Sequence, residues 1–121
     1  MKNQKINFNE KFKKVSGYWS PRVIAELNDY QFKLAKFKDE FISHRHEDTD
    51  EAFVVIEGTI YLEFDNTTET VNAGEMIIVS KGSAHKPFAK EEAKVLLIEP
   101  RGIVNTGNII NEFSVDNDIW V

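Results

Sequence analysis

Three histidines and one glutamate are the residues of this chain whose types and spacing could do chemistry. His44 and His46 are two positions apart, and side chains at that spacing in an extended strand point to the same face. Glu51 follows across an acidic corner, and His85 lies beyond a loop that contains Gly82. Three imidazoles and one carboxylate form a mixed nitrogen and oxygen set, which suits Zn, Mn, Fe, Ni, Co or Cu better than Ca or Mg. The spacing therefore predicts one divalent transition metal ion bound by these four side chains.

This prediction rests on the combination, because a His-x-His pair alone is a weak signal. Here all three histidines of the chain join one pattern with a carboxylate. If the metal is octahedral, four protein ligands leave two positions for water or substrate, as in catalytic rather than closed structural sites. The chain has no cysteine, which excludes thiolate ligands, disulfides and a cysteine nucleophile.

The elements that must position these residues read as short strands separated by turns. The predicted strands cover residues 23–27, 30–37, 51–56, 59–64, 70–72, 76–79, 85–89 and 94–99. Such spacing favours an all-β antiparallel sandwich or barrel, with residues 76–79 as a buried strand. A short helical segment is predicted over residues 9–16, with Asn9 as its N-cap and Gly17 as its stop.

The turn at Glu57 and Gly58 predicts a hairpin in which Ile56 faces Thr59. One face then ends at Glu51 and belongs to the core, with Phe53, Val55, Ile60, Leu62 and Phe64 on it. The other face is too apolar to be fully wet, and it carries Ala52, Val54, Ile56, Thr59, Tyr61 and Glu63. Either the N-terminal segment or another strand covers this second face, or it is a homodimer interface.

These motifs resemble those of the cupin family over about residues 30–107. The first cupin motif ends His-x-His, three or four residues, Glu, six residues, Gly, and here His44, His46, Glu51 and Gly58 fit that frame. Gly74, Gly82 and His85 fit the second motif. Lys38, Ser80 and Ala89 depart from the usual Gly, Pro and Asn, but none of the three is a ligand position.

The resemblance implies a small antiparallel β-barrel, jelly-roll-like, with a metal inside one end. It also implies a homodimer, since cupins often dimerise. We expect residues 1–121 to form one domain, with the barrel at about 30–107, N-terminal strands within 1–29 and a C-terminal tail at 108–121.

Composition bounds the function further. The net charge is −5 and no basic cluster is longer than Lys13-Lys14, so nucleic acid is not an expected partner. The longest apolar run has five residues, from Ala52 to Ile56, and a transmembrane helix needs roughly 20. The N-terminus shows no apolar signal region, which favours a cytoplasmic location.

Two functions stay open at this stage. The first is a metal-dependent enzyme acting on a small oxygen-rich metabolite, with isomerase-, dioxygenase- or lyase-type chemistry. The alternative is a non-catalytic module that binds or senses a small, sugar-like molecule. Catalytic residues remain unknown, because the neighbouring Glu47, Asp48 and Asp50 are better explained as supporting or solvated carboxylates.

Overall fold

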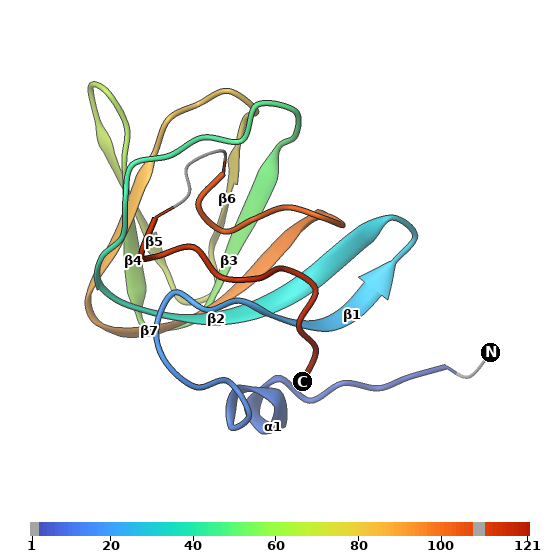
Figure 1. The fold of residues 1–121 in the computed structure, drawn as a ribbon. Coiled ribbons are helices and arrows are strands. Elements are labelled where there is room, and N and C mark those ends of the chain that lie inside the picture. Colours follow the sequence, from blue (N-terminus) through green and yellow to red (C-terminus); the bar gives the residue numbers. More distant parts are fainter. Residues whose placement is uncertain (1–2, 108–110) are drawn as a thin grey trace.

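Seven antiparallel strands and one short helix build the part of the chain that the computed structural model describes, residues 3–107 and 111–121 (Figure 1). The elements are α1 (Phe8–Phe12), β1 (Arg22–Leu27), β2 (Tyr30–Glu40), β3 (Glu51–Glu57), β4 (Thr59–Glu63), β5 (Thr68–Asn72), β6 (Met76–Val79) and β7 (Lys86–Pro100). Five strands lie in the order β1-β2-β7-β3-β6, while β4 pairs with β5 and β7. The expected all-β barrel is confirmed, and residues 1–2 and 108–110 of the predicted termini lie outside the described residues.

Strand β7 connects the two layers of the barrel. Its second half pairs with β2 and β3, and its first half pairs with β4 and with the end of β2. The prediction of separate strands at 85–89 and 94–99 is therefore wrong, because one strand runs through both. Opposite β7 the pairing jumps from Phe37–Ala93 to Asp39–Ala89, so the residues between Ala89 and Ala93 bulge where the strand bends.

The predicted hairpin at Glu57 and Gly58 is also wrong. Strands β3 and β4 follow each other along β7, where Glu57 pairs with Lys94 and Tyr61 pairs with Phe88. The chain makes a corner from one layer to the other instead of reversing. Gly58 has a φ of 84°, and a side chain there would press against the backbone at Glu92, so the corner needs glycine.

The predicted core face nevertheless holds, because alternation along a strand does not depend on its partner. The barrel interior contains Phe53, Val55, Ile60 and Leu62, and Phe64 packs against them. A second apolar cluster lies on the outer side of the sheet, where Val54 and Ile56 pack with Phe12 of α1. The N-terminal segment thus covers part of the second face, and the homodimer stays a prediction.

Two local predictions need correction. Helix α1 begins after Asn7, whose side chain accepts a hydrogen bond from the Glu10 N–H at 3.0 Å, so Asn7 and not Asn9 is the N-cap. Strand β6 is only half buried, since Met76 and Ile78 are 59% and 51% exposed. Among the described strands β6 pairs with β3 alone, so it is an edge strand with one face toward the core. No helix in the described ranges is long and apolar enough to cross a membrane.

Candidate metal centre

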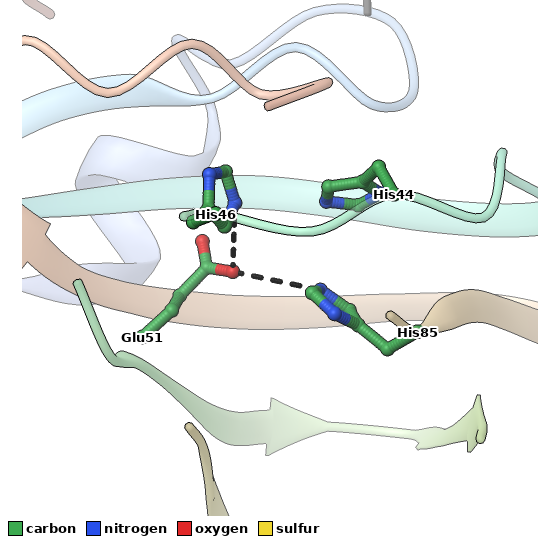
Figure 2. Close-up of side chains that lie close together, drawn as sticks. All are labelled: His44, His46, Glu51 and His85. Carbon is green, nitrogen blue, oxygen red and sulfur yellow. Dashed lines mark ion pairs between the residues drawn. The ribbon is translucent and has the colours of Figure 1, made fainter. Parts of the chain in front are cut away.

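The four predicted ligands meet inside one end of the barrel. Figure 2 shows His44, His46, Glu51 and His85 turned toward a common point. All four residues are buried, and one ligand atom from each lies within 4.8 Å of the others. The sequence therefore identified four residues that the fold brings together, while metal binding itself stays a prediction.

Backbone pairing near the end of the barrel explains this convergence. His44 and His85 form an isolated antiparallel bridge and exchange two hydrogen bonds of 2.9 Å between N–H and carbonyl groups. The Gly82 N–H then donates to the His46 carbonyl at 2.8 Å, which continues the alignment. Glu51 begins β3 opposite Val79. His44 and His46 thus share a side as predicted, although they lie in an extended link after β2 and not in a strand.

Two of the histidine rings are oriented by backbone carbonyls. The Nδ1 atom of His44 lies 3.0 Å from the Ile42 carbonyl oxygen, and that of His85 lies 2.9 Å from the Ser83 carbonyl oxygen. A carbonyl oxygen only accepts, so each Nδ1 carries the proton and donates it. Each Nε2 is then left with a lone pair, which is the arrangement that metal-ligating histidines show.

The inward-facing atoms are unsatisfied. In the described part of the chain, His46 Nε2, His85 Nε2 and Glu51 Oε1 are buried without a hydrogen-bond partner. Glu51 Oε1 lies 3.3 Å from His46 Nε2 and 3.8 Å from His85 Nε2. Buried polar atoms of this kind are costly unless something pairs with them. Three converging lone-pair atoms fit a cation.

Burial also sets the protonation of these groups. It lowers the pKa of all three histidines, and the pKa of His44 falls to about 3 because the neighbouring His85 adds to the effect of burial. Burial raises the pKa of Glu51 to about 7. At neutral pH the imidazoles are neutral and ready to bind a metal. Glu51 is partly protonated there, and a bound cation would displace its proton.

Three further buried polar residues were missed in the sequence. Gln31, Lys33 and Glu99 point into the barrel from β2 and β7, and Lys33 Nζ lies 3.7 Å from Glu99 Oε1. The signal was present, because the alternation of residues 30–37 places Lys33 on the same face as buried Ala35 and Phe37. We name Gln31, Lys33 and Glu99 the inner polar trio.

A small cavity of about 20 Å³ lies beside the ligands. His44, Glu51 and Glu99 line it together with Trp19. The Trp19 ring stacks on that of Phe37, with the ring centroids 4.3 Å apart. A space of this size holds about one water molecule.

The C-terminal segment encloses this end of the barrel. The Asn105 side-chain amide donates to the carbonyl oxygens of Trp19 at 3.1 Å and of Phe113 at 2.8 Å. At Gly107 the backbone passes so close to the Arg45 carbonyl that any side chain would clash. The loop that carries His44 and His46 is therefore supported from outside by the C-terminal segment.

Comparisons with known proteins agree with this fold. A family model described as Cupin domain matches residues 32–99. A cupin-2 domain containing protein from Shewanella frigidimarina has 57% sequence identity and a TM-score of 0.78, over 79% of this chain and 94% of that one. Protein NMB1881 from Neisseria meningitidis has 28% identity and a TM-score of 0.75, over 80% of this chain and 99% of that one.

The uncharacterized protein YdbB from Bacillus subtilis (strain 168) is a curated relative. It is 38% identical over 64 residues, which cover 52% of this chain and 57% of YdbB. The chain thus matches a little over half the length of that relative.

Proposed function

This chain belongs to the cupin family, and from that premise we propose that it holds one divalent transition metal ion on His44, His46, Glu51 and His85. The ion would serve a small oxygen-rich molecule that binds beside it. The observation that carries the proposal is the set of buried atoms on His46, His85 and Glu51 that converge without a partner among the described residues.

The chemistry follows from what the side chains do. When bound, a divalent ion here would supply a Lewis acid that polarises an oxygen of the small molecule beside it. The carbonyls of Ile42 and Ser83 hold two imidazoles in the required tautomer. Glu51 contributes the negative charge, and Trp19 and Phe37 keep bulk water away from the ligand. An electrostatic interaction in such a water-poor space is stronger than in bulk solvent.

The preferred form of this proposal is a metal-dependent enzyme with isomerase-, dioxygenase- or lyase-type chemistry. A second form is a binding or sensing module without turnover. Turnover of a small hydroxy- or keto-acid that stops on chelation and returns with the metal would decide for the enzyme. Saturable binding without conversion would decide for the sensor.

The metal proposal is tested by metal content. Purified protein loaded with Co²⁺, Zn²⁺ or Mn²⁺ and then desalted should retain about one ion per chain by elemental analysis. His85→Ala should weaken metal affinity roughly 1,000-fold, because one of four ligands is lost from a binding free energy of about 10–16 kcal/mol. Its circular dichroism should stay native, since the apolar clusters do not include the ion.

A control change far from the ligands is Glu91→Ala, at an exposed position in the bulge of β7. It should leave metal content unchanged. Wild-type protein that retains less than about a tenth of an equivalent of every metal tried would contradict the proposal.

A further inference from the structure

The inner polar trio lies next to the candidate metal ligands and is not used by them. Gln31 and Glu99 are direct partners across β2 and β7, and Lys33 follows on the same face of β2. The exposed fraction is 0% for Gln31, 2% for Glu99 and 3% for Lys33, so each residue is enclosed by protein. Three fully buried polar side chains on one face of a small barrel are costly to retain for stability alone.

Internal contacts satisfy only part of the trio. The Lys33 ammonium donates to the Ile103 carbonyl at 3.2 Å and lies 3.7 Å from Glu99 Oε1. The Gln31 amide nitrogen donates to Glu26 and to Asp118. Within residues 3–107 and 111–121, however, Gln31 Oε1 and Glu99 Oε2 are buried with no hydrogen-bond partner. Both atoms are acceptors, so what they lack is a donor.

Glu99 is also the member of the trio that reaches the candidate metal centre. Glu99 lines the same cavity as His44 and Glu51. Glu99 nevertheless stands outside the set of four converging ligand atoms. Its position therefore suits contact with a molecule held beside the ligands better than coordination of the ion itself.

We propose that Glu99 is a specificity-determining residue, whose Oε2 accepts a hydrogen bond from a hydroxyl or amino group of the small molecule bound beside His44 and Glu51. The Lys33 ammonium lies 3.7 Å from Glu99 Oε1 and holds that carboxyl group in place. The substrate class is then a small molecule with one oxygen for the metal and a neighbouring donor group, such as a 2-hydroxy acid. This inference rests on the proposed function, because the metal must hold the first group.

The test uses glycolate and acetate, which differ by one hydroxyl group, on Co²⁺-loaded protein. Calorimetry gives the ratio of the two affinities in each variant. Lys33→Met combined with Glu99→Met removes both members of the buried ion pair, so no unpaired charge is left in the core. The preference for glycolate should fall several-fold, up to about tenfold, in this double variant, since one hydrogen bond to a buried acceptor is lost. Any chelation of the metal by the hydroxyl is common to both proteins and cancels in the comparison.

Two further variants sharpen the test. Lys33→Met with Glu99→Gln keeps an acceptor oxygen of the same shape, so it should retain part of the preference and serves if the first variant fails to fold. Glu57→Met with Lys94→Met removes an ion pair of 3.1 Å on the outer side of β3 and β7, and should leave the preference unchanged.

The outcomes separate the two proposals. Wild-type protein that binds no Co²⁺ contradicts the proposed function. Protein that binds Co²⁺ but neither acid, or that keeps the same preference in the Lys33→Met, Glu99→Met variant, overturns the role of Glu99 while the metal centre stands. A fall in the preference for glycolate that is confined to the variants at Lys33 and Glu99 supports the role of Glu99.

Discussion

The two faces of β2 show how one strand serves two purposes. Residues Gln31, Lys33 and Ala35 point into the barrel, whereas Phe32 and Leu34 point to the outer cluster under α1. The outer face packs against apolar side chains. The inner face turns from apolar to polar along its length and ends beside Glu99. Two of the trio's oxygens on this inner side have no partner in the described part of the chain.

The two faces of β2 therefore have different roles. The outer face stabilises the fold, and the polar end of the inner face lies where a molecule could bind. Apolar burial on the outer side stabilises the fold whatever occupies the interior. The inner side also carries the main apolar core, but beside Glu99 it holds polar atoms that lack a partner in the described part of the chain. A change on one face should therefore leave the property of the other unchanged, which can be tested on a single strand.

The largest effect is expected for Leu34→Ala. Leu34 is fully buried between the sheet and the N-terminal segment, so its truncation leaves a cavity and should lower the free energy of unfolding by about 3 kcal/mol. Metal affinity should not change, because Leu34 faces away from the ligands. Urea denaturation and metal titration of the same sample measure both quantities. A parallel loss of metal affinity would break the separation between the faces.

A pH-dependent effect that reaches at most a similar size is expected for Glu51→Gln in chelator-treated protein. Burial raises the pKa of Glu51 from 4.5 to about 7, so the folded protein holds this proton more tightly than the unfolded chain does. The free energy of unfolding then decreases as the pH rises from 4.5 to 7, and the non-titrating glutamine avoids this loss. The apo variant should be more stable than apo wild type by up to about 3 kcal/mol at pH 8 and equal to it below pH 4.5.

The histidines change the free energy of unfolding of the apo protein with pH in the opposite direction. Their lowered pKa values mean that the unfolded chain takes up protons first, so stability is lost as the pH falls from 6.5 toward 3. Glu91→Gln, on the exposed bulge, should follow the wild-type curve throughout. Equal stability of wild type and Glu51→Gln at pH 8 would show that Glu51 is not desolvated in the apo protein.

The sequence predicted which four side chains converge better than it predicted the strand connections, and the reason is physical. Spacing two apart places His44 and His46 on one side wherever the chain is extended, and motif spacing brings in Glu51 and His85. The partner of a strand depends on distant residues, so a local turn signal at Gly58 could not distinguish a hairpin from a corner. Only the three-dimensional path of β7, which runs past both β3 and β4, resolves that choice.

The inner polar trio was missed for a related reason. A lysine in an alternating strand is ordinarily interpreted as solvent-facing, and Glu99 lies at the end of an apolar run. The alternation already placed Lys33 on the core face, but only the pairing of β2 with β7 puts Gln31 opposite Glu99 and encloses all three side chains. Strand β6 was expected to be buried because all four of its residues are apolar, and this pattern did not reveal that β6 forms an edge of the sheet.

That edge carries exposed apolar side chains outside both clusters. Met76 and Ile78 of β6 are exposed beside Tyr30, and a groove at this place also contains Asp48 and Lys81. An unpaired strand edge with apolar side chains is a site where another strand can add. A groove that carries both signs of charge is suited to a two-fold contact, in which the lysine of one copy meets the aspartate of the other. We propose that the expected homodimer forms at this edge and not on the face of Val54 and Ile56, which packs against Phe12 of α1.

The smallest effect on stability, and the last test of the comparison, is Ile78→Lys. Wild-type protein should elute as a dimer in light scattering, and the variant as a monomer, because a buried lysine at a two-fold contact repels its own copy. The free energy of unfolding of the monomer should change by no more than about 0.5 kcal/mol, since Ile78 is 51% exposed within one chain. Leu27→Lys, at an exposed position of β1, should leave the dimer intact. If wild-type protein is a monomer at all concentrations, the exposed residues of β6 contribute neither to the core nor to a dimer contact. The outer apolar cluster then stabilises only the single barrel.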